Sequence, residues 1–151
     1  MSSIHRLVFE NATAKLKELT WANYVEWETI KILSSEFNQH ELPAIQLYDT
    51  GDVAAQLRGR TDNVLSFAVE LVMVRNEGED VDQGLLLDRR LEIKRKLGED
   101  PGLGINTPAS IGRFKNIQYV GGVTDLHSLS PHLMVRLDFQ ALYEEPFTSE
   151  C

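Results

Sequence analysis

Two central stretches of the chain alternate apolar and polar residues, and this pattern predicts two neighbouring β-strands. They cover residues 42–48 and 63–74. In the second stretch, the alternate positions on one side of the extended chain are all apolar: Leu65, Phe67, Val69, Leu71 and Met73. The other side mixes small, polar and branched residues, which is typical of a surface that is half solvated or in contact with another subunit. We therefore expect an antiparallel strand pair with one buried face.

A polar segment, residues 49–62, connects these two strands. It is rich in Gly, Asp and Arg, and it is too long for a tight turn. Connections of this length without regular structure are usually functional or mobile. We interpret the segment as an irregular arm, and it is the first candidate for contacts with a partner.

Two other stretches have the spacing of amphipathic helices. Residues 4–19 carry apolar side chains on one face, and Ser3 is the expected N-cap. The second helix is expected to begin after Asp80 or Asp82 and to run to Leu97, because Gly98 favours a helix end.

The segment between the first helix and the first strand supports two interpretations. Large apolar residues recur at roughly three-residue intervals over residues 20–41, whereas residues 29–33 alternate like a short strand. We expect a helical extension or a loop, followed by an edge strand.

Two more strands are predicted near the C-terminus. Residues 115–120 alternate, and Gly121-Gly122 then mark a bulge or a turn. Residues 132–143 also alternate, with these apolar side chains expected inward: Leu133, Val135, Leu137, Phe139, Ala141 and Tyr143.

The order helix, strands, helix, strands defines the expected fold class. A long loop rich in Gly and Pro, residues 98–112, separates the second helix from the last two strands. We predict a single α+β domain over residues 1–151, in which two α-helices pack on one face of a mainly antiparallel or mixed β-sheet.

Composition is ordinary for a soluble protein. The chain has 151 residues, of which 42% are hydrophobic, and a domain of this length buries roughly 70% of its unfolded surface without help from a disulfide or metal. Cys151 is the single cysteine, which excludes a disulfide within the chain.

No apolar run approaches the roughly 20 residues of a membrane span, and no signal-peptide pattern follows Met1. We expect no membrane partner and a retained N-terminus.

Charge limits the choice of partners. The formal net charge is −8 and the isoelectric point is near 5.0, which argues against binding of a nucleic-acid backbone, since such binding requires a basic face.

Candidate catalytic groups are few. Asp49, Asp52, Asp62 and Glu70 could approach one another in the central hairpin, although solvated carboxylates in a loop are the ordinary alternative. Glu92-Ile93-Lys94 matches the end of a nuclease motif, but it lies in a helical pattern. We predict that the protein is not an enzyme and has no catalytic residue, cofactor or metal.

The order of elements and one motif resemble a known family. Residues 42–48, Leu-Pro-Ala-Ile-Gln-Leu-Tyr, are followed by Asp49-Thr50-Gly51, the polar arm, the long strand, the second helix and two closing strands. This arrangement resembles the tail terminator proteins of long-tailed bacteriophages, the lambda-like family. Residues 20–41 and 98–112 are longer than the minimal form of that family.

The resemblance implies a structural role in the virion. It implies a homo-oligomeric ring, usually a hexamer, which is assembled in the host cytoplasm and caps the tail tube at the neck-proximal end. Such a ring stops addition of tail tube protein and joins the neck, or head-completion, protein, while DNA passes through without specific binding. The alternatives are another neck or tail-completion protein of similar fold, or a small metal-dependent hydrolase or nuclease that uses Asp49, Asp52 and Glu70.

Opposed charges supply candidate contacts between subunits or with the tail tube. A closed ring requires two different, complementary patches on each subunit. The candidate interface residues lie on the arm and the second helix: Asp49, Asp52, Arg58, Arg60, Asp62, Arg89, Arg90 and Arg95. The ordinary alternative is that these charges are merely solvated.

Overall fold

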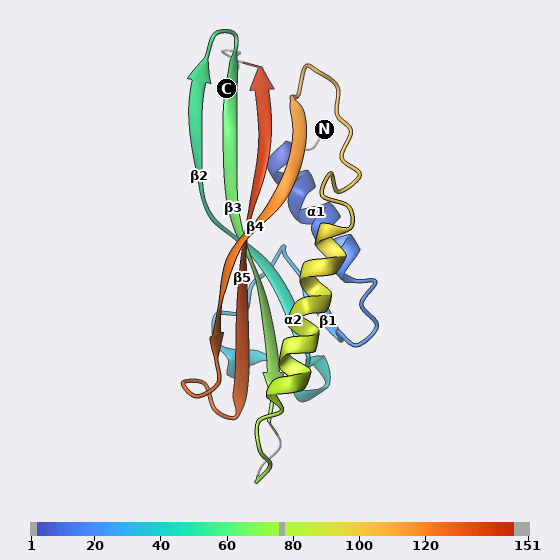
Figure 1. Ribbon diagram of the computed structural model, residues 1–151, viewed down its shortest axis with the longest axis vertical. Coiled ribbons are helices and arrows are strands. Elements are labelled where there is room, and N and C mark those ends of the chain that lie inside the picture. The colour runs from blue at the N-terminus through green and yellow to red at the C-terminus, as the bar shows by residue number, and fades with distance from the viewer. Residues whose placement is uncertain (1–2, 76–77, 147–151) are drawn as a thin grey trace.

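A computed structural model describes residues 3–75 and 78–146 of the chain (Figure 1). These residues form one five-stranded sheet with the strand order β1-β2-β3-β5-β4. The strands are β1 (Tyr24–Glu26), β2 (Ala44–Leu57), β3 (Arg60–Val74), β4 (Arg113–Asp125) and β5 (His132–Pro146). β1 pairs with β2 in parallel, and the other neighbours are antiparallel, so the sheet is mixed. Cys151 lies outside the described residues.

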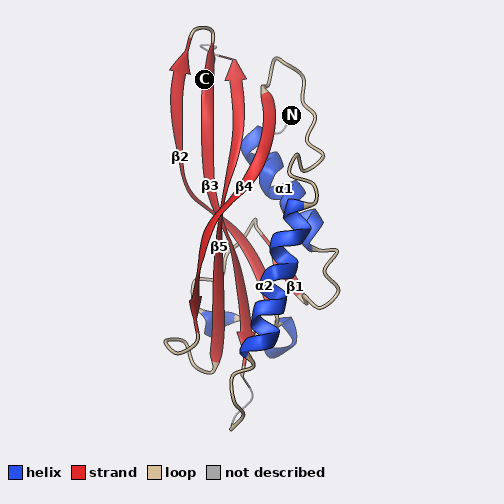
Figure 2. Ribbon diagram, viewed as in Figure 1, coloured by secondary structure: helices blue, strands red, loops and turns tan. Residues whose placement is uncertain are grey.

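Two α-helices, α1 (Ile4–Leu16) and α2 (Gln83–Gly98), lie on the same face of the sheet in the described part of the chain (Figure 2). The hydroxyl of Ser3 accepts a hydrogen bond from the backbone nitrogen of Arg6, and the carboxylate of Asp82 accepts one from Leu85. Both N-caps agree with the prediction, because these side chains satisfy amide groups that have no partner within the helix. The α+β class is therefore confirmed, although α1 ends three residues earlier than expected, at Leu16.

The core lies between the two helices and the sheet. Every residue of β3 and β5 that was expected to face inward is buried. Phe67 stands at the centre: its ring stacks on Phe139 at 5.6 Å between centroids and meets Phe9 of α1 edge-on at 5.8 Å. Buried residues of α2, Leu86 and Ile93, join the same cluster. A core of this kind fixes the register of the sheet, since a slip by one residue would turn the apolar side chains to water.

The prediction of an irregular arm over residues 49–62 is wrong. β2 and β3 continue through this segment as a hairpin, which is paired from Gly51 with Ser66 to Leu57 with Arg60. The turn is only Arg58-Gly59, and Gly59 takes a φ of 78°, which favours glycine. The hairpin persists because β3 is also paired on its other side, with β5, along its whole length. The polar composition thus reflects exposure to solvent and not a loss of strand structure.

Residues 20–41 contain an edge strand, but it lies earlier than the predicted one. β1 is followed by turns and two short 3-10 helices, η1 (Ser34–Glu36) and η2 (Gln39–Glu41), and the helical extension is absent from this described segment. Residues 29–33 form no strand because the amide side chain of Gln46 occupies the place of a strand partner: it bonds both the backbone nitrogen and the carbonyl of Lys31.

The C-terminal predictions agree more closely with the structure. β4 runs through Gly121-Gly122, and its register with β5 shifts between Tyr119 and Gly121, which confirms a bulge. Residues 99–112 form the expected irregular loop, with turns and no strand, whereas Gly98 is still the last residue of α2. No helix in the described residues is long and apolar enough to cross a membrane.

Candidate interaction surfaces

The outer half of the β2–β3 hairpin is the most exposed part of the sheet. Every residue of β2 from 49 to 57 is exposed, including Val53 at 71% and Leu57 at 45%. β1 pairs only with residues 44–46, so no described strand covers the free edge of this half. Unpaired backbone groups and exposed apolar side chains on one edge are typical of a contact surface.

The cross-strand register places an apolar row on the sheet face that the helices leave open. Val53 is opposite Val64, and Val64 is opposite Leu142 of β5. The neighbouring residue Leu65 points the other way, into the core. The row therefore belongs to the open face, where it crosses three strands.

Charges near the hairpin turn fall into two groups. Arg60 lies 3.3 Å from the carboxylate of Asp62 and 3.9 Å from that of Glu144, which also pairs with Lys115 at 3.2 Å. Arg58, at the turn itself, has no ion pair within the described residues and is exposed. Arg60 and Asp62 thus hold the end of the sheet together, whereas Arg58 is available to a partner.

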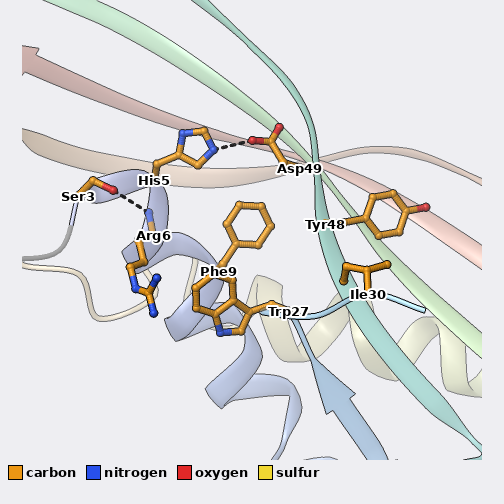
Figure 3. A pocket seen from close by; sticks show the side chains of 8 residues that line it. All are labelled: Ser3, His5, Arg6, Phe9, Trp27, Ile30, Tyr48 and Asp49. Atoms are coloured by element: carbon orange, nitrogen blue, oxygen red, sulfur yellow. Dashed lines mark hydrogen bonds and ion pairs between the residues drawn. The ribbon is translucent and has the colours of Figure 1, made fainter. Parts of the chain in front are cut away.

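The base of the hairpin is tied to α1 through Asp49 (Figure 3). His5 Nε2 and Asp49 Oδ2 lie 2.8 Å apart, and the other carboxylate oxygen accepts a hydrogen bond from the backbone of Gly51 at the β2 bulge. This side chain therefore has a structural role, because it fixes the point at which the exposed half of the hairpin begins.

A pocket of about 390 Å³ opens beside this contact between His5 and Asp49 (Figure 3). Phe9 and Trp27 stack at 5.9 Å between centroids, and the Arg6 guanidinium lies 4.8 Å from the Trp27 ring. Tyr48 lines the same pocket, and its hydroxyl donates to Glu70. Burial, followed by the charge of Glu70, raises the pKa of Tyr48 to about 12, so the hydroxyl stays protonated at neutral pH.

The four candidate carboxylates do not converge. Asp49 pairs with His5, Asp62 pairs with Arg60, and Glu70 accepts hydrogen bonds from Gln46 and Tyr48. Asp52 is exposed on the hairpin, opposite Leu65. Among the described residues, no three His, Cys, Asp or Glu side chains are grouped so that they could hold a metal ion.

The cationic residues of α2 are mostly used within the molecule. The Arg89 guanidinium lies 4.4 Å from the ring of Trp21, and Arg90 bonds the hydroxyl groups of Tyr119 and Thr124 on β4. Arg95 is exposed and makes no ion pair with any described residue. Arg89 and Arg90 therefore hold α2 in place, and Arg95 is the member of this set that faces solvent.

Beyond the predicted residues, the open face carries a groove of about 360 Å³ at the end of the sheet away from the hairpin turn. Ile32 and Leu33 line it and are 84% and 60% exposed. The sequence signal for the groove is this apolar pair, which falls within residues 29–33, where the alternation predicts a short strand.

The fold and these surfaces define an α+β protein with an exposed hairpin at one end and an apolar groove at the other. The sequence matches no protein-family model and no curated protein. A chain in a solved structure described as "Virion of native gene transfer agent (GTA) particle" is similar in fold. The match covers 94% of this chain and 92% of that chain, with a TM-score of 0.54 and 9% sequence identity. At this identity, the likeness shows a shared fold.

Proposed function

We propose that this protein is a structural component of a phage or phage-like virion and acts by assembling with other virion proteins. The observation that carries the proposal is the fold shared with a chain of a gene transfer agent virion over more than nine tenths of both chains. The exposed hairpin supports it independently, because a strand edge that no described strand covers, with exposed Val53 and Leu57, favours assembly.

The specific role we propose is that of a tail terminator, with residues 1–151 as one terminator domain. Copies of the chain form a ring, a hexamer by the family resemblance, that caps the tail tube and presents its other side to the neck protein. The order of elements and the motif at residues 42–51 support this role. The acidic net charge of −8 is compatible with passage of DNA through the ring without adhesion.

Deletion of the gene from the phage or particle that encodes it tests the role directly. Electron microscopy is expected to show overlong tails, or tails not joined to heads, because tube growth is no longer stopped. Normal tails beside heads that leak DNA would instead assign the protein to the neck. Tails of normal length joined to intact heads would contradict both roles.

A further inference from the structure

The groove at the end of the open face is lined by apolar side chains from four segments. Val72 of β3 and Met134 of β5 are register partners and form part of its floor. Ile32 and Leu33 form one rim, and Leu129 of the β4–β5 loop lies on the other. We call this site the Ile32 groove.

The exposed rim is held in place by the fold. Gln46 is 1% exposed and bonds both backbone groups of Lys31, at 3.1 and 3.0 Å. The Lys31 ammonium bonds the carboxylate of Glu41 and the carbonyl of Glu36, each at 3.2 Å. These contacts fix the backbone directly before Ile32, whose side chain is 84% exposed beside the groove. Exposed apolar side chains that gather around one groove are typical of an interaction site.

The groove also carries negative charge. The carboxylate of Glu70 lines it and accepts hydrogen bonds from two neutral groups, on Gln46 and Tyr48. Arg136, the register partner of Glu70 on β5, attracts this carboxylate and also bonds Asp138 at 2.9 Å, so one cation faces two carboxylates and the cluster stays negative. A complementary partner should therefore combine an apolar side chain with a cation.

The hairpin turn of the same chain has this chemistry. Val53 and Leu57 lie on the same side of β2 and are exposed, and Arg58 follows directly. We call residues 53–60 the arm tip. Because the arm tip and the Ile32 groove lie at opposite ends of the sheet (Figure 1), the tip cannot fill the groove of its own chain.

We propose that the arm tip of one copy docks in the Ile32 groove of a second copy. Leu57 enters among Ile32, Leu33 and Met134, and Arg58 approaches Glu70. Each copy then has one donor and one acceptor surface, which gives a head-to-tail contact that closes into a ring when the rotation between copies allows it. This inference rests on the proposed assembly and names the surfaces through which it forms.

Two single variants and their mixture test the contact. Leu57→Asp removes the donor surface and Ile32→Asp removes the acceptor surface, and both positions are exposed, so the fold should survive, which circular dichroism checks. By light scattering after size exclusion, each variant alone is expected at the monomer mass of 17.1 kDa. Mixed in equal amounts, they retain one intact donor and one intact acceptor, so they are expected to form a dimer of twice that mass.

The control is Val120→Asp, which changes a valine of β4 that is 57% exposed and outside both surfaces. It is expected to keep the wild-type oligomeric mass. The inference is overturned if the wild-type protein is monomeric, if either Leu57→Asp or Ile32→Asp keeps the wild-type mass, or if the mixture stays monomeric. None of these outcomes affects the tail-length experiment, which judges the virion role separately.

Discussion

At the scale of single residues, Gln46 is a polar side chain that is buried in a strand, and its hydrogen bonds explain why. Its amide group forms the two hydrogen bonds that a neighbouring strand would otherwise offer to Lys31, and it also donates to Glu70 at 3.2 Å. A buried amide is tolerated when its polar atoms are paired in this way. The Gln46 side chain thus attaches Lys31 to the sheet as a neighbouring strand would.

Replacing Gln46 with Leu should therefore be costly. The backbone groups of Lys31 and the carboxylate of Glu70 would lose partners, and the expected loss in free energy of unfolding is about 1–3 kcal/mol. Urea denaturation measures this loss, and limited proteolysis should show earlier cleavage near Ile32. Gln118→Leu, on exposed β4, is the matched control and should change stability by less than about 0.5 kcal/mol. Equal stability of the two variants would contradict the role of Gln46.

Tyr48 gives a prediction on pH dependence. Burial and Glu70 raise the pKa of its hydroxyl to about 12 in the folded protein, whereas an unfolded tyrosine has a pKa of about 10. The folded state therefore binds the proton more tightly. Stability should be constant with respect to this group below pH 10 and should fall between pH 10 and pH 12.

Tyr48→Phe removes this group, so the decline in stability above pH 10 should be shallower than in the wild type. Some decline remains, because burial also raises the pKa of Tyr143 to about 12. At pH 8, the variant should be less stable by about 1 kcal/mol, since the hydrogen bond to Glu70 is lost. Urea unfolding at pH 8, 10, 11 and 12 checks both effects, and parallel pH curves for the two proteins would refute the assignment.

At the scale of elements, the sequence predicts the core better than it predicts the exposed hairpin. The period of two in β3 and β5 is set by burial on one face, so alternation identified the strands and their inward side chains. Residues 49–62 lack this signal because neither face of β2 is buried there. Their strand structure comes from hydrogen-bonded pairing within the β2–β3 hairpin. Such tertiary pairing cannot be predicted from local composition.

The same reasoning explains the cationic residues of α2. Sequence alone gives Arg89, Arg90 and Arg95 the same role, although the helical spacing places Arg90 on the face of Leu86, Ile93 and Leu97. Only the packing of Trp21 and Tyr119 against α2 separates the first two from Arg95. Trp21 is itself held by a hydrogen bond from its indole nitrogen to Glu92.

Arg89 and Arg95 form a matched pair for mutation. Arg89→Ala should lower the free energy of unfolding by about 0.5–2 kcal/mol, because it removes the contact between the guanidinium and the Trp21 ring. Arg95→Ala should change it by less than about 0.5 kcal/mol. Urea unfolding followed by tryptophan fluorescence measures both. If the Arg95 variant were the less stable one, the assignment of these roles would be wrong.

At the scale of the whole molecule, the two ends of the sheet differ in charge. The cationic turn of the hairpin lies at one end, and the groove with Glu70 lies at the other. The net charge of −8 makes copies of the chain repel one another, so a local attraction between unlike ends is needed to bring them together. Arg58 of the hairpin turn and Arg60, the first residue of β3, differ in their ability to supply this attraction.

Arg58 has no ion-pair partner among the described residues, whereas Arg60 is bound to Asp62 and Glu144. Arg58→Glu should therefore weaken association of copies by about tenfold or more, equivalent to about 1.4 kcal/mol, and leave the stability of the monomer unchanged. Arg60→Glu places a third acid beside two others, so it should mainly lower monomer stability, by about 0.5–1 kcal/mol. Sedimentation equilibrium and urea unfolding separate the two effects. Equal association by the wild type and Arg58→Glu would show that the turn does not contact a neighbouring copy.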